Sequence, residues 1–167
     1  MAAKFFNLFP KMTFNDMSLV DITRHIVFQD IVKKYAVFFE KITIQDGQKP
    51  EDIAYDYYQD AGYHWIVLLA NDMINPYYDW PLISNNLSKL VNDKYEDPNG
   101  VHHYETNRLS PLPIGTIVDE SYSSGERDAI TNFEYEDRLN ESKRSIILVK
   151  KDFLPRILDE FDRKIVL

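Results

Sequence analysis

Apolar residues recur with clear periods in the middle of the chain. The stretch 34–44 is rich in β-branched and aromatic residues and alternates cleanly at its end, which predicts a strand that closes at the turn signal Asp46-Gly47. Pro50 stands at a favourable first helical position, and the apolar residues within 53–58 form one stripe at helical spacing. These patterns predict a strand followed by an amphipathic helix that Gly62 ends.

A second helix is predicted directly after the first, and it supplies the expected core. Trp65, Leu68 and Leu69 fall on one face, and Asn71 is a suitable C-terminal stop. We expect this face to bury against the preceding helix and strand. The expected contacts are Ile53, Ala54 and Tyr57, with Ile42 or Ile44 beneath them.

Further elements are predicted along the rest of the chain. Apolar residues at helical spacing predict a third helix over 84–93, and residues 97–100 form a strong turn. Residues 101–105 are expected to return as a short strand. Residues 145–149 predict another strand, and Asp152 is expected to cap a final amphipathic helix.

Two segments lack any sustained period. Residues 1–20 carry Phe5, Phe6, Phe9 and Phe14, which are awkward on a solvated tail. These rings either fold back on their own domain or dock on a partner chain. Residues 106–132 contain several prolines, glycines and serines and are predicted to form a long loop or extended arm. Because compact domains seldom hold a structureless loop longer than about 12–15 residues, this arm is expected to lie on another surface.

The composition restricts the class of protein. The 167 residues are 44% hydrophobic and 28% charged, as in an ordinary folded chain, and the absence of cysteine removes disulfides, thiolate metal sites and a cysteine nucleophile. The formal net charge is −8. Because a protein that binds duplex nucleic acid gathers cations to displace the phosphate counterions, nucleic acid is not expected as a partner.

Neither a membrane span nor a secretory signal is predicted. The longest continuous apolar run is Trp65–Ala70, far below the roughly 18 residues that suggest a membrane-spanning helix. The apolar stretch at the N-terminus is interrupted at Asn7 and ends at Pro10, which is short for a signal-peptide core. A soluble protein made in a cytoplasm, with no membrane partner, is therefore expected.

No catalytic, cofactor or metal site is predicted. The chain lacks a phosphate-binding glycine loop, a dinucleotide fingerprint and a nucleophile elbow. His102 and His103 are adjacent on a predicted strand and should point to opposite faces, so they are not expected to share an ion. We therefore expect neither enzyme activity nor a small-molecule substrate.

Aromatic residues are dense around the predicted helix pair. Such a cluster forms core and protein interface, or alternatively a platform on which a ligand such as a sugar stacks. The residues concerned are Tyr55, Tyr57, Tyr58, Tyr63, Trp65, Tyr77, Tyr78 and Trp80.

Part of this pattern resembles a LysM module. The strand, the helix from Pro50 and the second helix ending at Asn71 follow one another as in the strand–helix–helix–strand unit of that family. LysM modules have a Gly-Asp-Thr turn before the first helix. This chain reads Gly47-Gln48-Lys49 there, so Lys49 replaces the capping threonine.

Most of the chain resembles the baseplate wedge protein 53 family of contractile-tailed phages. Each motif is weak alone, but their order and spacing make the match specific. The motifs are Asp21–Arg24, Ile44–Gly47, Pro50–Tyr55, His64–Asp72, Asn75–Pro81, Val101–Glu105, Asn132–Glu136, Arg138–Glu141 and Lys143–Ile146.

The resemblance implies an α+β fold, with a small LysM-like strand-helix-helix-strand domain, extended N-terminal and C-terminal arms and a C-terminal strand-helix. The expected segments are an N-terminal arm over 1–33, the LysM-like domain over 34–105, an extended loop or arm over 106–144 and the strand-helix over 145–167.

The resemblance also implies a structural baseplate wedge subunit of the virion tail, assembled in the host cytoplasm, that joins neighbouring wedges around the central hub. The implied partners are other wedge and inner-baseplate proteins in sixfold array. The alternative is a peptidoglycan-binding LysM module of a tail-associated lysin. The partner-interface residues, inferred from the aromatic clusters and not from the resemblance, are Phe5, Phe6, Phe9, Tyr77, Tyr78 and Trp80.

Overall fold

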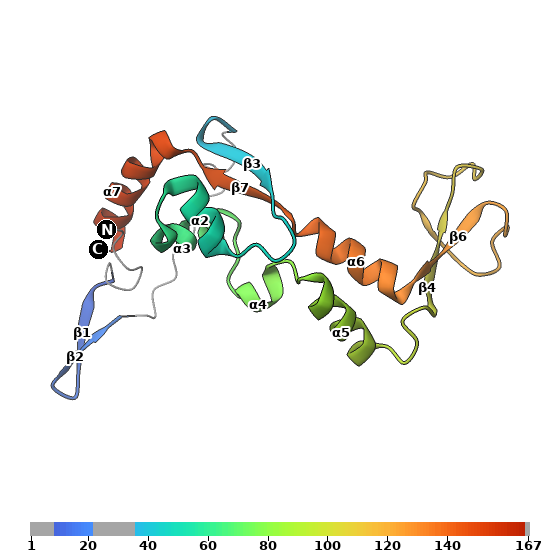
Figure 1. Cartoon of the computed structure of the whole chain (residues 1–167), viewed down its shortest axis with the longest axis horizontal. Coiled ribbons are helices and arrows are strands. Elements are labelled where there is room, and N and C mark those ends of the chain that lie inside the picture. The colour runs from blue at the N-terminus through green and yellow to red at the C-terminus, as the bar shows by residue number, and fades with distance from the viewer. Residues whose placement is uncertain (1–8, 22–35, 166–167) are drawn as a thin grey trace. The chain divides into compact units, whose positions relative to one another are not determined.

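The structure is a computed structural model that describes residues 9–21 and 36–165. Contacts divide the chain into two compact units. Unit 1 comprises Met1–Trp80 and Ser145–Leu167, and unit 2 comprises Pro81–Arg144, which is inserted into unit 1 in the sequence. Both units contain helices and strands (Figure 1). The α+β class expected from the sequence is therefore confirmed.

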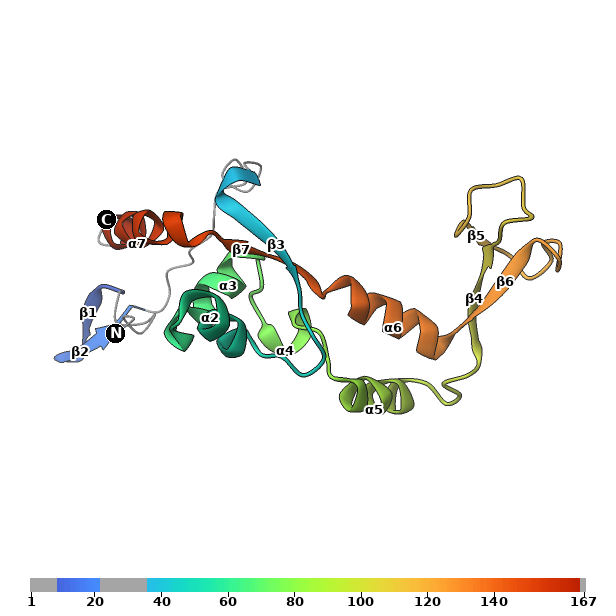
Figure 2. The same cartoon turned by 45° about the horizontal axis from the view of Figure 1, so that its top comes forward.

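The sheet of unit 1 joins two strands that lie far apart in the sequence. After the short 3-10 turn η2 (Ala36–Phe38), β3 (Phe39–Thr43) pairs antiparallel with β7 (Ser145–Val149). The two strands lie side by side in Figure 1 and Figure 2. The strand predicted at 101–105 forms, but it takes no part in this sheet because it pairs within unit 2.

The two helices predicted to follow the first strand are present directly after β3. α2 (Pro50–Tyr58) begins with proline, whose missing N–H costs nothing in the first turn. The Asp52 carboxylate accepts a hydrogen bond from the Lys49 N–H at 3.0 Å, which satisfies one of the free groups near the helix start. The 3-10 turn η3 (Ala61–Tyr63) then leads directly into α3 (His64–Ala70).

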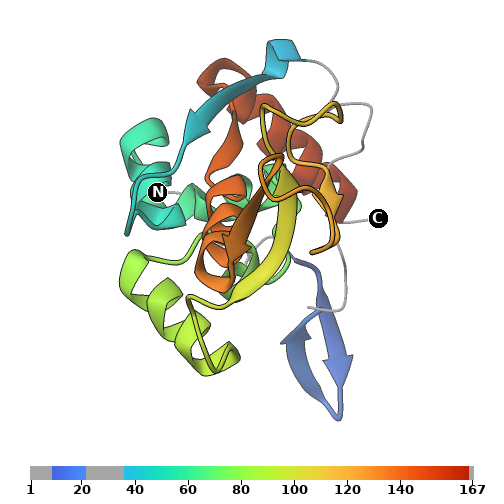
Figure 3. The same ribbon diagram turned by 90° about the vertical axis from the view of Figure 1, so that its right-hand side faces the viewer.

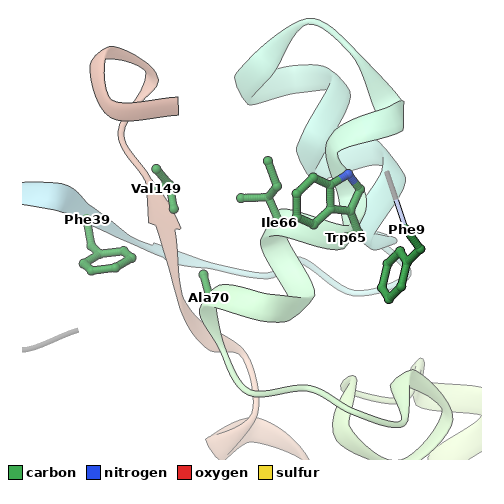
Figure 4. Packing of buried hydrophobic residues seen from close by; sticks show 6 residues of the cluster. All are labelled: Phe9, Phe39, Trp65, Ile66, Ala70 and Val149. Carbon is green, nitrogen blue, oxygen red and sulfur yellow. The ribbon is translucent and has the colours of Figure 1, made fainter. Parts of the chain in front are cut away.

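The buried side chains of unit 1 form two clusters. One contains Phe9, Phe39, Trp65, Ile66, Ala70 and Val149 (Figure 4), and the other contains Ile44, Ile53, Ala54, Val67, Ile146 and Leu148. Trp65 is buried as predicted, but Val67 and not Leu68 shares the cluster of Ile53 and Ala54. The predicted contact set was wrong because α3 is buried around much of its circumference, whereas a single apolar stripe was assumed.

The described part of the N-terminal segment forms a β-hairpin that the periodicity did not predict. β1 (Lys11–Phe14) and β2 (Met17–Val20) pair antiparallel across a two-residue turn. Asn15 and Asp16 both have positive φ, 48° and 61°, as tight hairpin turns of this length require. Each strand has only four residues, the lower limit at which alternation is visible.

Unit 2 contains a three-stranded sheet in the order β5-β4-β6, with both outer strands antiparallel to the central one. β4 (Val101–Thr106) is the predicted strand, and it lies beside β6 (Arg127–Thr131) in Figure 3. β5 (Ile117–Val118) completes the sheet. Part of the segment 106–144, expected as an extended arm, is therefore a folded sheet.

A helix occupies the rest of that segment. α6 (Asn132–Ser142) follows β6 directly, and Thr131 caps it. The Thr131 hydroxyl accepts from the Glu134 N–H at 3.1 Å, and the Glu134 carboxylate accepts from the Thr131 N–H at 2.9 Å. This capping box is visible in the sequence and was missed. α6 packs against α5 (Ser84–Lys94), which confirms the helix predicted at 84–93.

Two buried polar side chains on α6 stabilise unit 2. Asn140, 4% exposed, accepts from the Leu82 N–H at 2.7 Å and donates to the Leu82 carbonyl at 3.0 Å. Glu136, 8% exposed, accepts from Lys94 Nζ at 2.6 Å and from the Tyr95 hydroxyl at 2.8 Å. Burial alone would raise the pKa of Glu136, but these two hydrogen bonds and the charge of Lys94 outweigh it and hold the pKa below its ordinary value.

The C-terminal strand and helix predicted for unit 1 are both present. After β7, the 3-10 turn η4 (Lys151–Phe153) leads into α7 (Leu154–Ile165), whose Leu154 and Ile157 pack against the cluster that contains Trp65. Asp152 lies inside η4 and does not cap α7, so that assignment was wrong. The sequence pattern did not reveal the intervening 3-10 turn.

Candidate functional site

α4 (Pro76–Asp79) presents two of the aromatic residues expected at a partner interface. Asn75 caps this one-turn helix: its side chain accepts from the Tyr77 N–H at 3.1 Å, and its own N–H donates to the Asp79 carboxylate at 2.9 Å. On this fixed backbone Tyr77 is 88% exposed and Tyr78 is 74% exposed. One short turn therefore directs two large aromatic rings into solvent.

Trp80 follows α4 but contributes to the packing of unit 1. Its indole N–H donates to the Gln48 carbonyl at 2.9 Å, and its half-buried ring packs against the cluster that contains Ile53. Trp80 thereby attaches α4 to the turn that precedes α2. Of the three aromatic residues expected at an interface here, Tyr77 and Tyr78 are exposed and Trp80 is half-buried.

Of the three N-terminal phenylalanines expected at an interface, Phe9 is described, and it is 6% exposed. Figure 4 shows its ring beside the indole of Trp65, in the first cluster of unit 1. Phe9 thus packs on its own domain, which was one of the two alternatives left open by the sequence. Phe5 and Phe6 lie outside the described residues.

The β1–β2 hairpin carries an exposed apolar face, of which the sequence pattern indicated Phe14 but not the other three residues. Met12 stands opposite Leu19 and Phe14 opposite Met17. Directly opposed residues of an antiparallel pair project from the same face, and so do residues two apart on a strand. All four side chains therefore share one face, and each is between 43% and 56% exposed. The signal was present as alternation on both sides of the Asn15-Asp16 turn.

The loop from β4 to β5 also exposes aliphatic side chains from an ordered backbone. Thr106, 3% exposed, holds the loop together: its hydroxyl donates to the Pro113 carbonyl at 2.6 Å and accepts from the Thr116 N–H at 3.0 Å. The exposed aliphatic residues are Leu109 at 75%, Leu112 at 42% and Ile114 at 70%, followed by Ile117 at 69% at the start of β5. The internal hydrogen bonds give this part of the segment 106–132 a defined structure within unit 2.

A β-bulge in β4 places two histidines together. Val101 pairs with Thr131 and His103 pairs with Ile130, so His102 is an extra residue on its strand. The bulge interrupts the alternation of side chains, and the Nδ1 atoms of His102 and His103 lie 2.8 Å apart. The prediction that these rings point to opposite faces was wrong because it assumed a regular strand.

Tyr57 shows how a titratable group contributes to the packing of unit 1. The Tyr57 hydroxyl donates to the Glu40 carboxylate at 2.7 Å, and burial together with that carboxylate raises the pKa of Tyr57 to about 12, so the phenol remains a donor. Across residues 9–21 and 36–165, no three His, Asp or Glu side chains are grouped to hold a metal ion. In the same ranges no helix has the length and apolar character needed to cross a membrane.

A comparison with known protein families finds a match for this chain. The family described as base plate wedge protein 53 matches residues 5–109, more than half of the chain. The chain belongs to the base plate wedge protein 53 family. A comparison with curated proteins finds no match.

Membership of the base plate wedge protein 53 family gives the protein a structural role in the tail baseplate of a bacteriophage virion. The resemblance found in the sequence is thus confirmed for its family. The matched range includes the β1–β2 hairpin, the two helices that bury Trp65, the aromatic turn α4 and strand β4. Two of the exposed apolar surfaces, on the hairpin and on α4, therefore lie inside the region that defines the family.

Proposed function

We propose that the protein joins neighbouring wedges around the central hub of the baseplate by binding other proteins. The observation that carries this proposal is the pair of exposed apolar surfaces in unit 1, the Met12/Phe14/Met17/Leu19 face and the Tyr77/Tyr78 turn. Aromatic and methionine side chains are enriched at the centres of protein interfaces. Two such surfaces on one chain suit a subunit that contacts more than one neighbour.

The proposed partners are other wedge and inner-baseplate proteins in sixfold array, with assembly in the host cytoplasm before the virion is complete. A joining subunit needs binding surfaces and no reaction centre, so we propose that it has no enzymatic activity. The net charge of −8 supports protein partners over nucleic acid, because phosphate backbones bind cationic surfaces.

Removing both exposed tyrosines of α4 should weaken wedge joining while leaving the fold intact. Truncation of an aromatic residue at an interface hot spot costs about 2 kcal/mol or more, which lowers affinity roughly 30-fold. We therefore expect the Tyr77→Ala/Tyr78→Ala variant to melt close to the wild-type temperature and to leave wedges unjoined. Sedimentation and electron microscopy of an assembly reaction with the other wedge subunits measure this.

Tyr55→Ala is the matched control, because Tyr55 is also an exposed tyrosine of unit 1, at 59%, but lies on α2. It should leave both melting and assembly unchanged. Normal wedge joining by the double variant, at wild-type protein concentrations, would remove α4 from the proposed interface.

The peptidoglycan-binding alternative makes the opposite prediction in a binding assay. LysM modules have Gly-Asp-Thr where this chain has Gly47-Gln48-Lys49, and the Gln48 carbonyl is already bound by the Trp80 indole at 2.9 Å. We therefore expect no saturable binding of an N-acetylglucosamine oligomer in calorimetric titration. A dissociation constant below about 1 mM, which corresponds to roughly −4 kcal/mol, would instead support the lysin module.

A further inference from the structure

The backbone of the β1–β2 hairpin directs half of its hydrogen-bonding groups outward. Beside the open end of the hairpin, the Asp21 N–H donates to the Pro10 carbonyl at 2.8 Å, so these two residues form a hydrogen-bonded pair. Hydrogen-bonded and non-hydrogen-bonded pairs alternate along an antiparallel ribbon. Every second residue of each strand therefore points its N–H and C=O groups away from the partner strand. The residues concerned are Lys11 and Thr13 on β1, and Ser18 and Val20 on β2.

These outward groups lie on two open edges. In the part of the chain that the structure describes, the sheet consists of β1 and β2 and no further strand (Figure 1). A two-stranded ribbon is marginally stable in water, whereas three strands with an apolar face are stable. An open edge is also a template on which another strand pairs. The hairpin thus has the form of a sheet that a further strand can extend.

The two edges differ in their protection against pairing. Proteins shield a solvated edge strand with proline and with charged residues, lysine above all. The β1 edge has both, because Pro10 lacks an N–H and Lys11 follows it. β2, Met17–Val20, has neither a charged residue nor a proline. The β2 edge is therefore the one suited to accept a strand.

The Met12/Phe14/Met17/Leu19 face adjoins this edge. Val20 projects from the opposite face of the hairpin, because neighbours on a strand alternate, and it packs against the first cluster of unit 1. The apolar face is therefore directed away from that contact. A third strand beside β2 continues the apolar face with every second side chain, so its alternate residues have to be apolar.

The size of the apolar face favours a strand as its occupant. Its four side chains are each about half exposed, so together they offer roughly 400 Å². A stable specific interface buries about 800 Å² on each partner. Contact through this face alone is therefore too small for a stable dimer of the chain. A strand adds main-chain hydrogen bonds along the β2 edge to the same apolar contact.

We propose that the β2 edge accepts an extended strand of another baseplate protein, so that β1, β2 and that strand form one three-stranded sheet. The accepted strand has apolar residues at alternate positions and no charge beside Ser18. This inference rests on the proposed function, which supplies the class of partner. It adds the mode of binding, main-chain pairing at a defined edge.

Proline substitutions test one edge at a time, because Thr13 and Ser18 stand directly opposite each other. The N–H of each points outward, so proline removes a donor to a partner and no hydrogen bond within the hairpin. The full chain is titrated with each of the other wedge subunits. Ser18→Pro should lower the affinity for one subunit at least about tenfold, because a carbonyl of the accepted strand loses its donor. Thr13→Pro, the matched control, should bind that subunit as the wild type does.

The outcomes separate this inference from the proposed function. If the wild type joins wedges and Ser18→Pro binds every subunit equally well, the strand addition is overturned and the proposed function stands. If the wild type joins no wedges, the proposed function fails and this inference fails with it. A dimer of the free protein that Ser18→Pro dissociates would assign the edge to a second copy of the chain, and would also overturn the proposal.

Hydrogen exchange of the wild type decides the matter if a proline variant fails to fold. When the wedge subunits are added, the amides of Ser18 and Val20 should exchange at least about tenfold more slowly than in the free protein. The amides of Lys11 and Thr13 should keep their rates. Unchanged exchange at Ser18 and Val20, or equal slowing on both strands, would contradict pairing at the β2 edge.

Discussion

Replacing Trp65 with alanine will lower the free energy of unfolding by about 3–5 kcal/mol, because the substitution loses the transfer energy of the indole and leaves a cavity. Trp65 is 5% exposed and lies in the cluster with Phe9, Ile66 and Val149 (Figure 4). The loss is a large part of the roughly 5–15 kcal/mol that holds a typical domain folded. Urea unfolding followed by circular dichroism measures it.

Ile74→Ala is the control for this experiment. Ile74 is 77% exposed, so this variant truncates a large aliphatic side chain that already lies in solvent. Surface substitutions of this kind change stability by about 0.5 kcal/mol or less. If Trp65→Ala behaved like Ile74→Ala, the buried position of the indole would be refuted.

Replacing Asn71 with alanine should cost about 2–4 kcal/mol, because it removes three hydrogen bonds and leaves backbone groups of β7 without them. The Asn71 amide donates to the Val67 and Ile147 carbonyls, each at 2.8 Å, and its carbonyl accepts from the Ile147 N–H at 2.8 Å. The Asn71 side chain therefore hydrogen-bonds to the backbone edge of β7 that does not pair with β3. The free energy of unfolding, from urea titration, gives the cost.

Asn71→Asp separates the roles of the two ends of the amide. The aspartate can still accept from the Ile147 N–H, but it directs a second carboxylate oxygen at two carbonyls, so we expect it to be no more stable than Asn71→Ala at neutral pH. Asn92→Ala is the control, since the Asn92 side chain donates to the Ser88 carbonyl at 2.8 Å on an exposed face of α5. A loss for Asn71→Ala no greater than for Asn92→Ala would contradict the structural role of Asn71.

The individual elements were predictable because their signals are local. Each of three signals determines its own segment: the turn at Asp46-Gly47, the proline at the start of α2 and the apolar run of β7. The pairing of strands was not predictable in this way, since 101–105 and 145–149 both look like strands. The burial of their side chains distinguishes the two strands. β7 supplies Ile146, Leu148 and Val149 to the core of unit 1. Most side chains of β4 are exposed or half-exposed.

The candidate interface was predictable only in part. The signal Asn75-Pro76 indicates the capped turn that exposes Tyr77, but nothing in the sequence separates Tyr77 from Trp80, because the difference arises from the contact of Trp80 with Gln48, a residue distant in the sequence. The bulge at His102 depends on the register of β4 against β6, which no local pattern encodes.

The insertion of unit 2 between β3 and β7 has a consequence for synthesis on the ribosome. All residues of Pro81–Arg144 emerge before β7 does, so unit 2 can fold while α2 and α3 still lack half of their sheet. Unit 1 can close only after its second strand is made. Because lengthening a closed loop twofold costs only about 0.6 kcal/mol in chain entropy, the insertion can change in length at small cost to the stability of unit 1. The segment that can fold first is thus also the one whose length is least constrained.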